Sequence, residues 1–133
     1  MIKSSIIFLN KFMNFTNEEI ASKIRVDSYG YMCFDKSLRI YVTNDVMNIV
    51  AEQHPKIQML DLSDCAAIID LKFLTKLPNL THLYLTRCMK INDLAPINSL
   101  NNLTYLDVGG CINVMEKQID ELHVHKLSVW THG

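Results

Sequence analysis

The chain has 133 residues, of which 49% are hydrophobic and 20% charged. This is the size and composition of one folded domain, and it excludes a disordered or low-complexity chain. Thirteen Lys and Arg against fourteen Asp and Glu give a net charge of −1, which argues against a nucleic acid or an anionic membrane as a partner bound mainly by charge. No apolar run reaches the length of a membrane-spanning helix, about 20 residues, so we expect no membrane insertion.

The N-terminal segment, residues 1–34, lacks the repeat that organises the rest of the chain. Thr16 and Glu19 form a capping-box pattern, which predicts a helix over about residues 17–25. The sequence Asp-Ser-Tyr-Gly at 27–30 predicts a turn. We interpret this segment as a helical cap, because the first unit of a repeat array exposes its apolar core unless something covers it.

Three later segments align without gaps and follow one another at a constant period. Their shared pattern is L-x-x-L-x-L-x-x-C, with Ile or Val allowed at the Leu positions. The segments are IQMLDLSDC (57–65), LTHLYLTRC (80–88) and LTYLDVGGC (103–111). The alternation Leu-x-Leu predicts a strand with both leucines on one inward face. Between these segments, apolar residues three positions apart predict a short α-helical or 3₁₀ return that leads to a parallel neighbouring strand.

Two incomplete copies flank the clear ones. Near residue 35, Leu38 and Ile40 precede the paired leucines of the first clear unit by one position less than a full period. Near residue 124, Val124, Leu127 and Val129 repeat the 3-then-2 spacing, with a histidine where the cysteine would fall. This last copy starts slightly less than one period after the third clear unit. We therefore assign residues 35–133 to repeats, with clear units starting at 57, 80 and 103 and degenerate units at both edges.

The pattern resembles the leucine-rich repeat, whose consensus is L-x-x-L-x-L-x-x-N/C-x-L. The cysteine at the ninth position is similar to the cysteine-containing class found in F-box leucine-rich-repeat proteins and, more distantly, to mitochondrial ATP synthase coupling factor B. The resemblance implies an α/β fold. The expected architecture is a short right-handed solenoid with a parallel β-sheet on its concave face and short helical or 3₁₀ returns on its convex face. It leaves open whether residues 1–34 are a cap, a targeting peptide or an F-box remnant.

The repeated cysteines are candidates for a structural role. Cys65, Cys88 and Cys111 share one phase of the repeat, and neighbouring strands would place them about 4.8 Å apart in a ladder. Three equivalent thiols cannot all pair in disulfides, and no C-x₂-C pair supports a metal site. Cys33 has no place in the ladder.

Motifs for catalysis or cofactor binding are not found. The sequence contains no G-x-G-x-x-G or G-x-x-x-x-G-K-[ST] pattern. His123 and His125 lie two apart in an extended segment, but no Cys or carboxylate stands at a convincing metal-ligand spacing. We therefore expect no enzyme activity, no cofactor and no metal.

The outward positions of the strands are the candidate binding surface. Tyr, Trp and Arg are over-represented in binding hot spots, and solenoids use their concave sheets to bind partners. The spacing of the last copy places Lys126 beside Tyr105, and Ser128 beside Asp107. The candidate partner-binding residues are His82, Tyr84, Arg87, Tyr105, Asp107, Lys126 and Trp130.

These features predict a non-enzymatic protein-interaction module, either an adaptor or an assembly subunit. The resemblance leaves two alternatives open: substrate recognition in an F-box-type ubiquitin ligase, and a mitochondrial assembly factor similar to coupling factor B. Because the sequence stops at a predicted strand, we expect the protein to work within a larger complex. We expect an intracellular, cytoplasmic location, with Lys3 and Lys11 in an acid-free N-terminus permitting a mitochondrial one.

Overall fold

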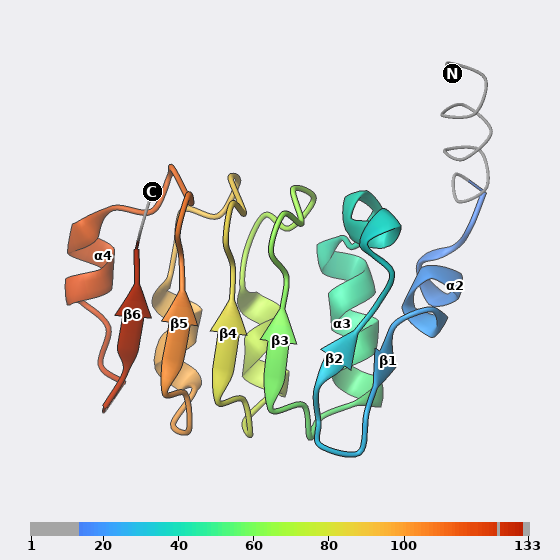
Figure 1. The fold of residues 1–133 in the computed structure, drawn as a ribbon, viewed down its shortest axis with the longest axis horizontal. Helices are drawn as coiled ribbons and strands as arrows, with labels where there is room; N and C mark the ends of the chain where they lie inside the picture. The colour runs from blue at the N-terminus through green and yellow to red at the C-terminus, as the bar shows by residue number, and fades with distance from the viewer. Residues whose placement is uncertain (1–13, 125, 132–133) are drawn as a thin grey trace.

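A parallel four-stranded sheet forms the front layer of the protein in the computed structural model, which describes residues 14–124 and 126–131 (Figure 1). Its strands are β3 (Met59–Asp61), β4 (His82–Tyr84), β5 (Tyr105–Asp107) and β6 (Ser128–Trp130), and they neighbour one another in chain order. Each of these strands is short, because one apolar position flanked by two outward ones is all that the motif supplies. The parallel sheet and the mixed helix and strand content fit the predicted α/β repeat fold.

Short helical segments form the layer behind the sheet (Figure 1). They are α3 (Asn44–Gln53), the 3₁₀ helices η2 (Lys72–Lys76) and η3 (Ala95–Ser99), and α4 (Glu116–Asp120). Asp70 and Asp93 start the two 3₁₀ helices in the same way, since their Oδ1 atoms accept hydrogen bonds from the backbone N–H groups of Lys72 and Ala95. The predicted short returns between strands are therefore confirmed, as 3₁₀ helices after β3 and β4 and as the α-helix α4 after β5.

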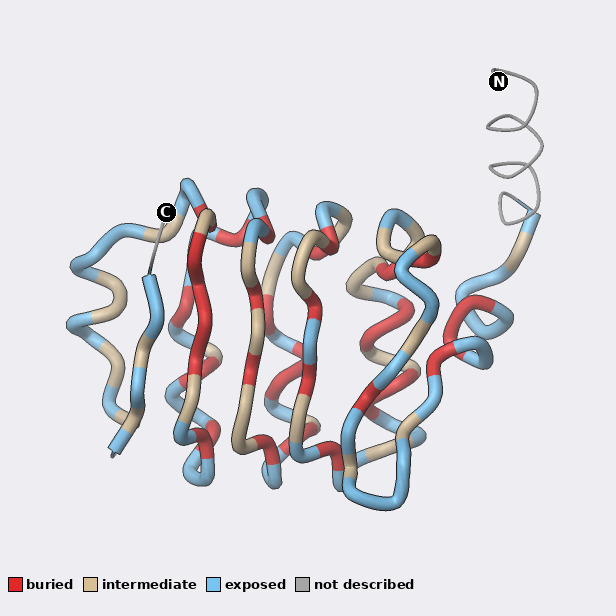
Figure 2. Tube along the Cα trace, in the orientation of Figure 1, coloured by how far each residue is buried: buried red, intermediate tan, exposed pale blue. Residues whose placement is uncertain are grey.

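The fully buried core lies between these two layers and ends at β5, whereas the apolar residues of α4 and β6 are only partly buried (Figure 2). Leu60, Leu83 and Leu106 pair across the strands and are fully buried, as are the apolar residues of η2. Burying one such leucine contributes roughly 1.5–3 kcal/mol. A single unit could not bury its own leucines, so the repeats stabilise one another through this shared core.

The N-terminal part consists of one helix and a two-stranded hairpin. Helix α2 (Asn17–Ser22) begins at Thr16, and the predicted capping box is present, because Thr16 and Glu19 exchange side-chain to backbone hydrogen bonds. Strands β1 (Arg25–Val26) and β2 (Met32–Cys33) pair antiparallel around the predicted turn. The Gly30 carbonyl accepts hydrogen bonds from Gln58 and Met59 N–H, which attaches the hairpin to the start of β3.

One predicted strand is wrong. Residues Lys36–Tyr41 form a 3₁₀ helix, η1, so Leu38 and Ile40 are not strand positions equivalent to the leucine pair of β3. Asp35 caps this helix through the N–H of Ser37, and Ile40 is exposed while Leu38 is buried. The place beside β3 is taken by the hairpin, which reaches it through a bridge between Tyr31 and Met59.

The predicted register of the last strand is also wrong. Val129, not Leu127, pairs with Leu106, so the full repeat period continues without the shortening that the sequence suggested. The backbone agrees, because Val108 N–H donates to Trp130 O at 2.9 Å, as Leu85 N–H donates to Asp107 O at 2.8 Å one unit earlier. Consequently Ser128 lies beside Tyr105, Trp130 lies beside Asp107, and Lys126 precedes the strand.

Candidate functional site

Two rows of outward residues cross the front of the sheet. In each strand the central apolar residue points into the core, so the residues before and after it face outward. We define the first row as Met59, His82, Tyr105 and Ser128, and the second row as Asp61, Tyr84, Asp107 and Trp130, each row following the strand register. Together the two rows are called the sheet face.

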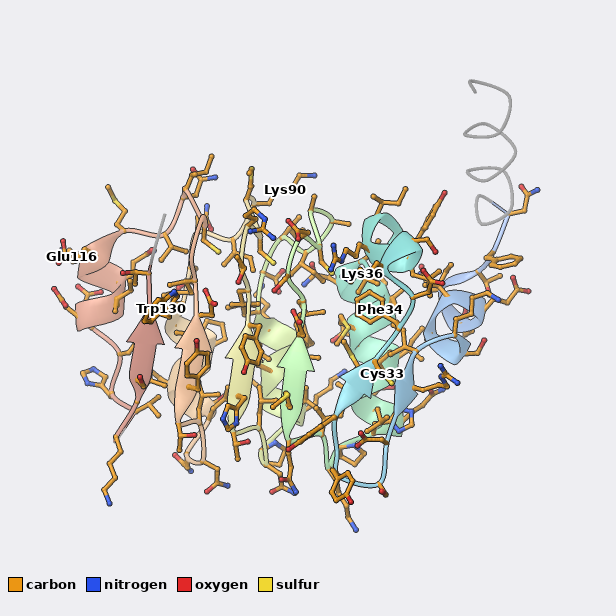
Figure 3. The ribbon with its side chains drawn as sticks, viewed as in Figure 1. Cys33, Phe34, Lys36, Lys90, Glu116 and Trp130 are labelled. Atoms are coloured by element: carbon orange, nitrogen blue, oxygen red, sulfur yellow. The ribbon has the colours of Figure 1, made fainter. Side chains whose placement is uncertain are left out.

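Aromatic rings at the centre of the sheet face contact one another. The ring of Tyr105 lies 5.2 Å from that of Tyr84 and 5.8 Å from that of His82, with the His82 and Tyr105 rings stacked at 25°. All three side chains are half-buried, so packing against each other holds them while one side stays accessible. Trp130 lies on β6 and is 52% exposed. It is far from Cys33 and Phe34, which lie at the β2 end of the molecule (Figure 3).

The two carboxylates of the second row are held by the backbone that follows their strands. Asp61 Oδ1 accepts a hydrogen bond from Ser63 N–H, and Asp107 Oδ1 accepts one from Gly109 N–H, both at 2.9 Å. Asp107 is only 7% exposed, whereas Asp61 is exposed. Burial and the electrostatic effects of the Tyr105 hydroxyl and of these two carboxylates raise the pKa of Tyr84 above its usual value.

A group of ion pairs lies in the turns that follow the strands, beside the sheet face. Asp64, Arg87 and Gly110 occupy equivalent positions of successive repeats, and all three have positive φ angles of 58–71°. Arg87 binds Asp64 through two bonds of 2.6 and 2.7 Å, and Arg39 lies 3.4 Å from the same carboxylate. The hydrogen bond from Arg87 lowers the pKa of Asp64. Arg87 therefore borders the sheet face instead of standing within it.

The three repeated cysteines are buried behind the same turns and are free thiols. The Sγ of Cys88 donates to Leu62 O at 3.0 Å, and the Sγ of Cys111 donates to Leu85 O at 2.8 Å. Burial raises the pKa of the Cys65 thiol from 9.0 to about 12 and also raises the pKa of the other two. Because the thiolate is the reactive form, this environment suits a structural group and opposes nucleophilic or redox chemistry.

The structure brings some of the sequence-predicted binding residues together and separates others. His82, Tyr84, Tyr105 and Asp107 are neighbours, and Trp130 joins them in the second row. The two predicted cations lie apart from this group, Lys126 before β6 and Arg87 in the turn above β4. Tyr31, which sequence reasoning missed, extends the first row beyond Met59. Its place depends on the hairpin, which has no counterpart in the repeat.

Clusters of metal-ligating side chains and long apolar helices are the two features that a metal site and a membrane span require. Within residues 14–124 and 126–131, no three His, Cys, Asp or Glu side chains gather as a metal site would require. His123 is exposed, and His125 and His132 lie outside the described residues. None of the helices in the described part of the chain is both long and apolar enough to cross a membrane.

One pocket lies away from the sheet face. Its volume is about 410 Å³, and it opens between the β1–β2 turn and the end of α3, where Asp27, Tyr29, His54 and Lys56 line it. The Asp27 carboxylate already accepts hydrogen bonds from the N–H groups of Tyr29 and Tyr31, so this carboxylate stabilises the hairpin turn.

The geometry defines a repeat protein in which each unit contributes one strand, one cysteine-containing turn and one short helical return. Residues 55–96 match the family described as Leucine Rich repeats (2 copies). This segment, which includes β3, η2 and β4, therefore carries leucine-rich repeats. The comparison with curated proteins finds no match. The finer resemblance to F-box proteins and to coupling factor B stays a prediction.

Proposed function

We propose that this protein is a non-enzymatic interaction module that binds a protein partner on the sheet face, as an adaptor or as a subunit of a larger assembly. Leucine-rich repeats generally mediate protein–protein interaction. In this proposal the repeats build a short right-handed solenoid, and the sheet face is its concave side.

The observation that carries the proposal is the packed aromatic group of His82, Tyr84 and Tyr105. Aromatic side chains that are already held in place lose little conformational entropy on binding, which is why they dominate binding hot spots. These rings stand on the most regular part of the fold, where consecutive strands keep a constant register. A rigid platform of this kind suits a macromolecular partner.

Replacing Tyr84 and Tyr105 by alanine tests the proposal. The expected result is loss of partner capture by the tagged full chain, because two of the three packed rings are removed. A matched control is the double variant Ile112→Ala/Met115→Ala, which removes two side chains that are 73% and 70% exposed and lie outside both rows. Circular dichroism and thermal unfolding check that each variant is folded.

The proposal requires partners that are lost with the tyrosine variant and kept with the control, as quantified by mass spectrometry of the captured proteins. Equal capture by the wild-type chain and the tyrosine variant would show that the sheet face is not the binding surface.

The cysteine-containing motif is the observation that favours two narrower roles. A substrate-recognition subunit of an F-box-type ubiquitin ligase would co-purify with the ligase scaffold. An assembly factor similar to coupling factor B would locate to mitochondria when a tagged copy is imaged. Neither result is needed for the broader proposal, since both roles use a bound protein partner.

A further inference from the structure

The second row alternates acidic and aromatic side chains across four strands. Asp61, Tyr84, Asp107 and Trp130 follow one another in the register of β3 to β6. Neighbouring strands lie about 4.8 Å apart. Tyr84 therefore lies between two carboxylates, Asp61 on the preceding strand and Asp107 on the following strand.

The two carboxylates of this row form no salt bridge within the described part of the chain, although Arg87 attracts Asp107 electrostatically. Both neighbouring arginines, Arg39 and Arg87, form their salt bridges with Asp64. The other two salt bridges found among residues 14–124 and 126–131 join Lys76 to Glu52 and Lys117 to Glu121, so Asp61 and Asp107 belong to none. The sheet face thus offers a partner the exposed carboxylate of Asp61 and the largely buried carboxylate of Asp107, which is 7% exposed.

The row is also held rigidly. Each carboxylate is fixed by a backbone N–H two residues further along the chain. The ring of Tyr84 packs at 5.2 Å against Tyr105, which stacks on His82. An aromatic face attracts a cation within about 6 Å of its centroid, and carboxylates beside it add to the attraction.

We propose that the sheet face recognises a partner segment that carries an arginine side chain, with the guanidinium group over Tyr84 between Asp61 and Asp107. This inference rests on the proposed function, because it names the chemistry of the partner for the same face. A guanidinium is favoured over an ammonium group because it is planar, stacks on aromatic rings and forms paired hydrogen bonds to carboxylates. An acidic or phosphorylated segment would be repelled by the same pair of aspartates.

A display library of random peptides, selected on the immobilised full chain, tests this inference without knowledge of the natural partner. The key variant is Asp61→Asn/Asp107→Asn, since asparagine keeps the oxygen that accepts the Ser63 and Gly109 N–H bonds and removes only the charge. A charge-matched control is Glu52→Gln/Glu116→Gln, which removes two exposed carboxylates from α3 and α4. A third variant, Tyr84→Ala/Tyr105→Ala, reports on the face itself.

The inference predicts that selected peptides are enriched in arginine and bind the asparagine variant at least about tenfold more weakly at low salt, while the charge-matched control binds normally. Replacing the arginine of a selected peptide by citrulline has the same weakening effect. Peptides without cations that depend on Tyr84 and Tyr105 would overturn the arginine inference and leave the proposed function standing. If no peptide depends on Tyr84 and Tyr105, both are overturned.

Discussion

The Sγ atom of Cys88 lies 3.0 Å from the carbonyl oxygen of Leu62, which belongs to the preceding repeat. Cys111 repeats the contact one unit later, at 2.8 Å from Leu85 O. Each thiol thereby adds a second donor to a carbonyl that follows the neighbouring strand and that already accepts a backbone N–H, from Cys65 at Leu62 O and from Cys88 at Leu85 O. The row of buried cysteines thus joins each repeat unit to the preceding one through hydrogen bonds as well as through apolar packing.

Replacing Cys88 by alanine should lower the free energy of unfolding by about 1–2 kcal/mol, because the buried sulfur loses its packing and its hydrogen bond to Leu62 O, although that carbonyl still accepts the N–H of Cys65. Urea denaturation followed by circular dichroism measures the loss. The control is Cys33→Ala, at an exposed position outside the ladder, which should change stability by no more than about 0.5 kcal/mol. Equal stability of the two variants would contradict the bonding role of Cys88.

Native thiol labelling should distinguish Cys33 from the other cysteines. At a pH of about 8 in native buffer, iodoacetamide should modify Cys33, which is exposed, and leave Cys65, Cys88 and Cys111 unmodified because they are buried and protonated. In strong denaturant all four cysteines should react. Peptide mass spectrometry identifies the modified residues, and rapid native labelling of Cys88 would contradict the burial of the ladder.

The ladder should also make stability fall at high pH. The pKa of Cys65 rises from 9.0 to about 12 on folding, so its contribution to stability is complete below pH 9.0 and is lost as pH rises toward about 12. Cys65 then adds a slope of up to about 1.4 kcal/mol per pH unit in this window. Urea denaturation at several pH values should show a shallower decline for Cys65→Ala than for the wild-type chain; identical slopes would contradict the raised pKa.

Gly110 is required by the turn after β5. Its φ angle is 71°, and a Cβ atom added there would lie 2.8 Å from Cγ of Arg87. Gly110→Ala should therefore cost about 1–3 kcal/mol of stability, measured by thermal or urea unfolding. In the Arg87→Ala background, which already lacks the salt bridge to Asp64, the additional change Gly110→Ala should cost less, because the steric contact is absent and the backbone strain remains. A neutral effect of Gly110→Ala would show that the turn adopts another conformation.

The repeat itself could be predicted from the sequence because its cause is local and periodic. Leucines at a fixed spacing place Leu60, Leu83 and Leu106 in one core row, and the same period aligns the cysteines behind them. The proposed central binding residues His82, Tyr84 and Tyr105 follow from the same alignment, since outward positions are the neighbours of inward ones.

The edges could not be predicted in this way, because there the apolar pattern has more than one alignment. Leu127 and Val129 offer two registers, and the sequence spacing favours the wrong one. Backbone hydrogen bonding selects Val129, which keeps the full repeat period and moves Trp130 beside Asp107. At the other edge, a short hairpin replaces a repeat strand, so Tyr31 joins the sheet face through tertiary pairing that no local motif announces.

Photo-crosslinking from the centre of the sheet face tests the central claim most directly. The chain carries p-benzoylphenylalanine in place of Tyr84 in one sample and in place of Ile112, an exposed residue outside the face, in the other. Our account predicts a discrete crosslinked protein partner from position 84 that is absent from position 112. The same partner crosslinking from position 112 and not from position 84 would contradict the assignment of the sheet face as the binding surface.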